Sequence, residues 1–243
     1  MLSLLKKEIR GFFSSLTGYI VIVLFLAITS LFLWIFPGEM NIMDAGYATL
    51  EPLFFIAPWV FLFLVPSITM RMFAEERKAG TLDLLLTRPL TEMQVILAKY
   101  LASVLLVLLS LIPTLVFYIS VYLLGNPQGN LDTGGTWGSY IGLFFLAAIY
   151  AAIGLFASSF TENQIISFLI SVVLCFLLYA GFDLLSALPA FHKMESLIIY
   201  LGISDHYKSL SRGVIDTTDI IYYLGIIGLF LFFTRTVLES RKW

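Results

Sequence analysis

The sequence predicts an all-α integral membrane protein, with six transmembrane helices preceded by an amphipathic helix at the membrane interface. Of its 243 residues, 60% are hydrophobic and only 12% are charged, whereas soluble domains carry about 25% charged residues. The apolar residues come in blocks rather than at amphipathic spacing, which is typical of spanning helices. The single cysteine, Cys175, lies inside such a block. It excludes an intramolecular disulfide, and we predict that it is a small buried hydrophobe.

The first predicted element covers residues 1–16, where apolar side chains recur at helical spacing while Lys6, Lys7 and Arg10 face elsewhere. This pattern favours a helix lying in the membrane interface with its lysines near anionic headgroups. A positive flank of the first span is a compatible alternative. A cleavable signal peptide is not expected, because the following apolar block is long enough to span and no small-residue cleavage pattern follows it. The apolar positions are Leu2, Leu5, Ile9, Phe12 and Leu16.

Six apolar stretches approach or exceed the ~20 residues that cross a hydrocarbon core. They cover residues 17–36, 52–70, 95–124, 140–158, 165–186 and 219–238. Pro113 predicts a tilt or kink in the third span. Pro52, Pro58 and Pro66 predict an irregular second span. Thr91 with Gln94 before the third span, and Thr161 with Gln164 before the fifth, each match a capping box.

The distribution of Lys and Arg predicts the orientation. Cytoplasmic termini leave most basic residues inside, and we therefore predict that both termini are cytoplasmic. The inner ones are Lys6, Lys7, Arg10, Arg71, Arg77, Lys78, Arg88, Lys99, Arg235, Arg241 and Lys242, and the outer ones are Lys193, Lys208 and Arg212. Of the outer segments, 125–139 is predicted to be turn-rich and 187–218 to hold short helices that re-enter the interface.

Several chemistries are disfavoured by what the chain lacks. No predicted span has a charge near its middle, and Asp183, Lys99 and Arg235 lie toward span ends, where we expect them to snorkel. This disfavours an ion-coupled transporter or channel. The sequence has no phosphate-binding Gly-x-x-x-x-Gly-Lys-Ser/Thr loop. His192 and His206 are expected to be solvated or interfacial rather than catalytic or metal-binding. We expect no enzyme activity, no cofactor and, at a net charge of −2, no nucleic-acid partner.

Residues 71–92 form a charged island between apolar spans. Glu75, Glu76, Arg77 and Lys78 give it a polar face, Gly80 and Thr81 a break, and Leu82, Leu84, Leu85 and Leu86 an apolar patch before Pro89. From the residues alone, a helix that transmits force from a cytoplasmic partner and a routine solvated connection are equally supported.

The run 76–89, ERKAGTLDLLLTRP, resembles the cytoplasmic signature of ABC-2 type transporter permeases, approximately Glu-Arg-x-x-Gly-Thr-Leu-Glu-x-Leu-Leu-x-x-Pro, with Asp83 where Glu is usual. The six spans, cytoplasmic termini and leading helix agree with that family. The resemblance therefore implies one ABC-2 type transmembrane domain over residues 1–243, with an interfacial helix (1–16), a coupling segment (71–92) and an extracytoplasmic segment (187–218). The residues implied to contact the ATPase are Glu75, Glu76, Arg77, Gly80, Thr81, Leu82, Asp83, Pro89 and, in a second loop, Glu162.

The resemblance also implies partners and a location. ATP would be bound by a separate ATP-binding cassette subunit, and the chain itself would lie in a bacterial inner membrane. A second permease chain would complete the translocation path. Residues 201–216 are similar to a stretch of the gliding-motility-associated ABC transporter permeases, which implies a companion auxiliary gliding subunit. An ABC-2 exporter of lipid, polysaccharide or drug unrelated to gliding, and a non-transporting membrane scaffold for an ATPase, remain alternatives.

Overall fold

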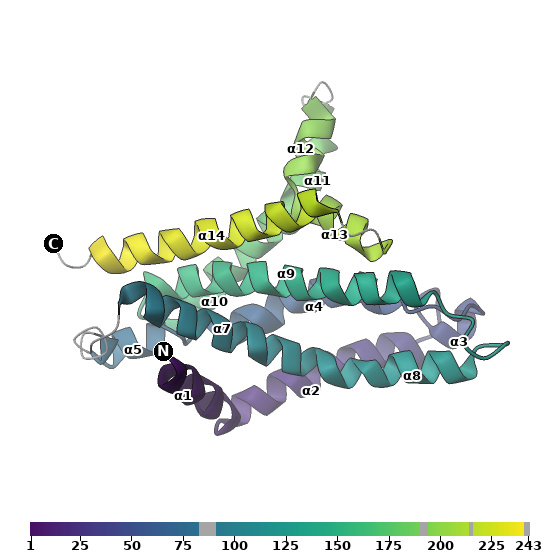
Figure 1. Cartoon of the computed structure of the whole chain (residues 1–243), viewed down its shortest axis with the longest axis horizontal. Helices are drawn as coiled ribbons and strands as arrows, with labels where there is room; N and C mark the ends of the chain where they lie inside the picture. Colours follow the sequence, from purple (N-terminus) through teal and green to yellow (C-terminus); the bar gives the residue numbers. More distant parts are fainter. Residues whose placement is uncertain (83–90, 190–193, 214–215, 241–243) are drawn as a thin grey trace.

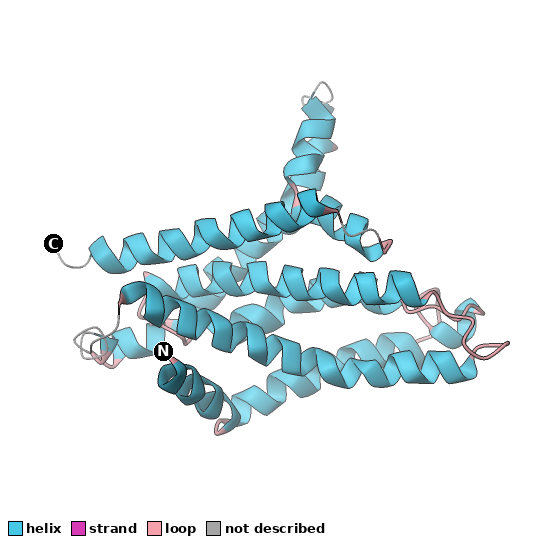
Figure 2. Ribbon diagram, viewed as in Figure 1, coloured by secondary structure: helices cyan, strands magenta, loops and turns pink. Residues whose placement is uncertain are grey.

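The computed structural model describes residues 1–82, 91–189, 194–213 and 216–240, and the regular structure of these residues is entirely helical (Figure 2). Six helical stretches among them are long and apolar enough to cross a membrane, which confirms the predicted fold class. They are Gly18–Ile35, Glu51–Lys78, Glu92–Leu124, Thr133–Ser159, Gln164–Ser186 and Thr217–Glu239.

Most of the spanning stretches lie along one long axis, while α11, at the end of the fifth stretch, and α12 rise away from it (Figure 1). One end of the bundle, which we call the α5 end, carries α1, α5 and the end of α14; the opposite end, the α3 end, carries α3 (Figure 1). The helices are α1 (Leu2–Phe13), α2 (Leu16–Ser30), α3 (Ile42–Ala45), α4 (Glu51–Thr69), α5 (Ala74–Lys78), α7 (Glu92–Leu111), α8 (Leu115–Leu124), α9 (Thr133–Ser159), α10 (Gln164–Phe176), α11 (Phe182–Ser186), α12 (Glu195–Leu201), α13 (Ile203–Ser211) and α14 (Thr217–Glu239).

Helix α9 is the centre of the bundle, because it packs against α4, α7, α10, α13 and α14. Small residues allow these close approaches. A Cβ atom at Gly138 would lie 2.7 Å from the Cα of Gly213, and one at Gly154 would collide with Thr69 of α4. Cys175 is buried in the same core, as the sequence predicted.

Helix α4 is continuous although it contains Pro58 and Pro66, so the prediction of an irregular second span was wrong. A proline inside a helix leaves the carbonyl four residues earlier without its backbone donor. For Pro58 that carbonyl belongs to Phe54, and the hydroxyl of Tyr207 donates a hydrogen bond to it at 2.8 Å. In an apolar environment such a side-chain donor lets the helix continue.

The predicted kink at Pro113 is confirmed: α7 and α8 are joined by a 3-10 turn over Ile112–Thr114. The Thr91 capping box is also confirmed, with Thr91 and Gln94 each accepting from the other's backbone N–H. The equivalent box at Thr161 was wrong. There the side chain of Asn163 accepts from the Ile165 N–H and caps α10, because the chain enters the helix two residues later than the pattern suggested.

The turn-rich outer segment 125–139 is shorter than predicted, since α9 begins at Thr133. The Asp132 side chain accepts from the Gly135 N–H at 3.0 Å and caps the helix. The added turns pack on α13, where the Ser139 hydroxyl donates to the Ser211 carbonyl at 3.1 Å. The predicted short helices of the segment 187–218 are confirmed as α12 and α13.

Candidate functional site

The candidate site is the junction at the α5 end, where the charged island meets α1, α7 and α9. Between α4 and α5 the chain turns, and the Phe73 and Ala74 N–H groups donate to the hydroxyl oxygen of Ser158 on α9, at 2.8 and 3.1 Å. The same hydroxyl donates to the Met70 carbonyl at 3.2 Å. Ser158 therefore supplies the partners that this buried turn needs and fixes the start of α5 to the central helix.

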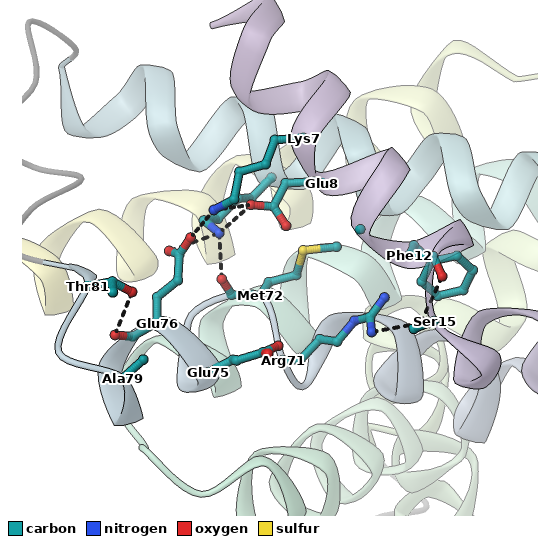
Figure 3. A pocket seen from close by; sticks show the side chains of 12 residues that line it. Lys7, Glu8, Phe12, Ser15, Arg71, Met72, Glu75, Glu76, Ala79 and Thr81 are labelled. Carbon is teal, nitrogen blue, oxygen red and sulfur yellow. Dashed lines mark hydrogen bonds and ion pairs between the residues drawn. The ribbon is translucent and has the colours of Figure 1, made fainter.

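Lys99 of α7 is the hub of the site, with 1% of its side chain exposed. Its Nζ lies 2.9 Å from Glu8 Oε1 on α1 and 3.0 Å from Glu76 Oε2 on α5. It also donates to the Met72 carbonyl at 2.6 Å. Figure 3 shows the three groups that Lys99 contacts, Glu8, Glu76 and Met72, turned toward one another in the space between α1 and α5. The expected snorkelling of Lys99 was wrong, because two carboxylates that are distant in the sequence neutralise it inside the protein.

Helix α1 is held by further contacts along its length. Lys7 Nζ lies 3.0 Å from Glu76 Oε1. At the other end of the helix, the Arg71 guanidinium lies over the Phe12 ring at 5.1 Å and donates to the Ser15 hydroxyl at 3.1 Å (Figure 3). Phe12 is buried. The predicted leading helix is thus packed onto the bundle through both its apolar and its charged side chains.

These side chains surround an open cavity of about 430 Å³, lined by residues of α1, the α4–α5 turn, α5 and α7. Its wall is densely charged, with Lys7, Glu8, Arg71, Glu75 and Glu76 around the buried Lys99. Figure 3 shows that α1 and α5 face each other across this space. The arrangement can resist relative movement of the two helices, because Lys99 and Lys7 bind the Glu76 carboxylate from α7 and α1, and Arg71 reaches from the α4–α5 turn to Phe12 of α1.

The Gly-Thr pair of the island ends α5 in a Schellman motif. The Gly80 N–H donates to the Arg77 carbonyl at 3.0 Å, and the Thr81 N–H donates to the Glu76 carbonyl at 2.9 Å. Gly80 has a φ of +66°, a conformation that glycine adopts without steric cost. The predicted break at this pair is confirmed, and it limits α5 to a single short helix.

The predicted site residues divide by exposure. Glu75, Gly80 and Thr81 are exposed, Glu76 and Arg77 are half-buried, and Leu82 is buried. Glu162 is exposed in the loop between α9 and α10, and α10 contacts α5. Asp83 and Pro89 lie outside the described residues, as do Leu84, Leu85, Leu86, Arg88, His192, Lys193, Arg241 and Lys242.

Sequence reasoning missed Glu8, Lys99 and Ser158. Glu8 carried a weak signal, since it is the single carboxylate in the otherwise basic leading segment 1–16. Ser158 carried none, because a serine near the end of an apolar helix usually bonds to its own backbone.

The interpretation of His206 as solvated or interfacial was wrong. It is buried on α13, where Nδ1 lies 2.6 Å from Asp219 Oδ1 and Nε2 donates to the Tyr200 carbonyl at 2.9 Å. Its ring stacks on Tyr222 with centroids 3.8 Å apart. These contacts tie α12 and α13 to the start of α14, and the partners lie up to 16 residues away, beyond the reach of local patterns.

The fold and the junction define a multi-pass membrane protein with a charged helix pair at one end of its bundle. A family model described as ABC-2 family transporter protein matches residues 2–238. The chain belongs to this family of transporter proteins, and it has the spanning helices of a permease subunit. No curated protein matches the chain.

Proposed function

We propose that the chain is the transmembrane subunit of an ATP-driven ABC transporter and that α5 receives a separate ATP-binding cassette subunit. The observation that carries this proposal is the burial of Lys99 between Glu8 and Glu76, which joins α5 to α1 and α7. A solvated connection between two spans would need no such anchor. A buried charge is costly unless it is fully paired, so the site is built to keep α5 in a fixed relation to the bundle.

The contacts of α5 lead to three spanning helices. It follows α4 in the chain, it reaches α7 through Lys99, and its first turn reaches α9 through Ser158. Movement of an attached cassette on ATP binding would displace α5 and, through these contacts, the three helices together. ATP then shifts the permease between two states because the cassette contacts differ between them. The ATP itself is bound by the cassette subunit.

The exposed side chains of α5 are the proposed contact surface, with Glu75 and Lys78 at its centre. Thr81 and the loop residue Glu162 extend this surface. Glu76, Arg77 and Gly80 shape the helix, and the buried Leu82 acts by packing rather than by direct contact. Asp83 and Pro89 are also proposed to contact the cassette, because they occupy positions of the family signature, where Asp83 keeps the charge of the usual Glu.

The α5 end is proposed to face the cytoplasm of a bacterial inner membrane, with both termini on that side. The described basic residues of α1, α5 and α7 gather there, which the positive-inside rule favours. A second permease chain, either another copy or a companion auxiliary gliding subunit, would complete the translocation path. A role in gliding motility rests on the similarity of residues 201–216 alone.

The test compares two charge exchanges that keep the net charge constant. Glu75→Lys with Lys78→Glu changes the exposed surface of α5, while Arg235→Glu with Glu239→Arg exchanges an exposed ion pair on α14 at the same end. Tagged chains are purified from native membranes in mild detergent, and co-purified proteins are identified by mass spectrometry. We expect a P-loop ATPase with the wild type and the α14 variant, and its loss from the α5 variant.

Retention of the ATPase by the α5 variant would show that α5 is not its binding surface. Absence of any ATPase from the wild type, under conditions that keep other complexes intact, would contradict the proposed function. Glu76 is left unchanged in this design, because its carboxylate contacts both Lys7 and Lys99 and its reversal would also disturb the fold.

A further inference from the structure

A second cavity, of about 510 Å³, lies among the start of α4, the junction of α10 and α11, and α13. It is unrelated to the α5 junction and falls in the size range of ligand-binding pockets. Its wall is polar at the rim and aromatic deeper in. This change from polar to aromatic side chains along one cavity indicates the chemistry of its ligand.

One wall is a stripe on α4 made by Glu51, Phe55 and Trp59, which follow at intervals of four residues and share a face. Eight residues of helix rise ~12 Å, so the stripe leads from the helix start well into the bundle. Phe55 is 60% exposed and Trp59 41% exposed. The cavity is therefore open sideways, along a helix that spans the membrane.

The opposite wall also has a carboxylate at the polar end and an aromatic ring deeper in the cavity. Asp183 of α11 stands at the polar end, and Tyr179 lies one turn deeper, with its ring packed edge-on against Trp59 at 5.7 Å. The Asp183 carboxylate accepts from the Ser204 hydroxyl at 2.7 Å and lies 3.4 Å from Lys208 Nζ. Two helices of opposite direction thus both place a carboxylate outside an aromatic ring.

The third wall, α13, is fixed in place. The Tyr207 hydroxyl donates to the Phe54 carbonyl, and α13 packs closely on α9, where a Cβ atom at Gly142 would lie 3.3 Å from the Tyr207 ring. Burial raises the pKa of Tyr207 well above its usual range, so the hydroxyl remains a donor. The cavity is part of the packed structure rather than a gap beside a loop.

The rim carries both signs of charge: Lys208 and Arg212 beside Glu51, Asp132 and Asp183. Neither Arg212 nor Glu51 has an ion-pair partner among the described residues. We propose that this cavity binds one phospholipid with a phosphate and a primary amine in its headgroup, of the phosphatidylethanolamine type. The phosphate would meet Arg212 and Lys208, the amine would meet Glu51 and Asp132, and the acyl chain would lie along Phe55 and Trp59.

The charges decide between this ligand and two others. Asp183 already lies beside Lys208, so an anionic headgroup without an amine would leave Glu51 and Asp132 without a cation. A wholly apolar ligand would desolvate the rim charges without pairing them. The lateral opening favours a molecule that arrives from the leaflet at the α3 end. The proposal does not depend on ATP coupling and holds or fails separately from it.

The test uses Trp59 as the reporter. In a variant with Trp34, Trp137 and Trp243 changed to Phe, the fluorescence of Trp59 is titrated in detergent with phosphatidylethanolamine or phosphatidylglycerol carrying brominated acyl chains. We expect quenching by the first lipid to saturate once a single molecule is bound per chain, and to need about two- to fivefold more of the second, the range of one exposed ion pair. A variant retaining only Trp137, which does not line the cavity, should show no headgroup preference.

Matched variants assign the headgroup contacts. Glu51→Gln should remove the preference for phosphatidylethanolamine, and Arg212→Gln should weaken both lipids. Glu39→Gln, which changes an exposed carboxylate outside the cavity lining, should do neither. Circular dichroism checks that each variant is folded. Equal quenching of Trp59 by both lipids, or a preference for phosphatidylglycerol, would overturn the proposal, because the cavity would then hold only bulk lipid or a different headgroup.

Discussion

Removal of the Lys99 charge tests the junction most directly. Lys99→Met keeps the length and apolar stem of the side chain but leaves Glu8 and Glu76 without the cation that lies 2.9 and 3.0 Å away. Breaking a buried ion pair by removing one partner costs about 3–5 kcal/mol. The lower end applies here, because Lys7 Nζ remains 3.0 Å from Glu76 and 3.8 Å from Glu8. We therefore expect a loss of about 3 kcal/mol in the free energy of unfolding.

The triple variant Glu8→Gln, Glu76→Gln, Lys99→Met separates charge from packing. With both carboxylates neutralised, no charge is left unpaired, and most of the loss should be recovered. The Met72 carbonyl still lacks the donor that Lys99 supplied, and an unsatisfied buried carbonyl costs about 1–3 kcal/mol. The triple variant should therefore be about 1 kcal/mol less stable than the wild type, at the low end of that range.

The assay is unfolding of the purified chain from mild detergent by added dodecyl sulfate, followed by circular dichroism. Lys6→Met is the control, since Lys6 is exposed on α1 and should change stability by less than about 0.5 kcal/mol. If Lys99→Met is as stable as the control, Lys99 is not the hub of the junction. If the triple variant is no more stable than Lys99→Met, the loss arises from packing rather than from unpaired charge.

Three further substitutions test single contacts by the same unfolding assay. Ser158→Ala removes the acceptor of the Phe73 and Ala74 N–H groups and should cost about 1–3 kcal/mol, whereas Ser158→Thr, which keeps the hydroxyl, should cost less. Gly80→Ala forces a side chain onto a φ of +66° and should cost about 1–2 kcal/mol; Gly11→Ala, in open space on α1, should not destabilise. Gly154→Ala places a methyl group against Thr69 and should cost about 1–3 kcal/mol, and no loss would show that α4 and α9 can move apart freely.

The fold was largely predictable because its elements are encoded locally. Spans of about 20 apolar residues, the kink at Pro113 and the Thr91 cap each depend on residues within one or two helical turns. The errors occurred where a distant residue changed the local rule. The Tyr207 hydroxyl serves the carbonyl that Pro58 leaves free, and it comes from 153 residues further along the chain than Phe54.

The sequence predicted which segment forms the site, but not how the side chains of that segment are arranged in space. The charged island stood out because so few charges occur elsewhere. The break at Gly80 was predictable because helices commonly end at a glycine in the left-handed conformation. The sequence could not show which of its side chains face outward. Glu76 and Leu82 turn inward toward the bundle, and that depends on how α5 docks on α1 and α7.

By itself, the sequence determined that the chain has six stretches long and apolar enough to cross a membrane, because this capacity depends on hydrophobic length whatever the helices then contact. Only the tertiary structure decided whether the charged side chains within and beside the spans are exposed to solvent or paired inside the protein. Lys99 is paired with Glu8 from 91 positions earlier, and His206 with Asp219 on another helix. A charge near a span end can snorkel, face a cavity or be paired inside the protein, and the choice depends on which distant carboxylate the packing of the helices brings within reach.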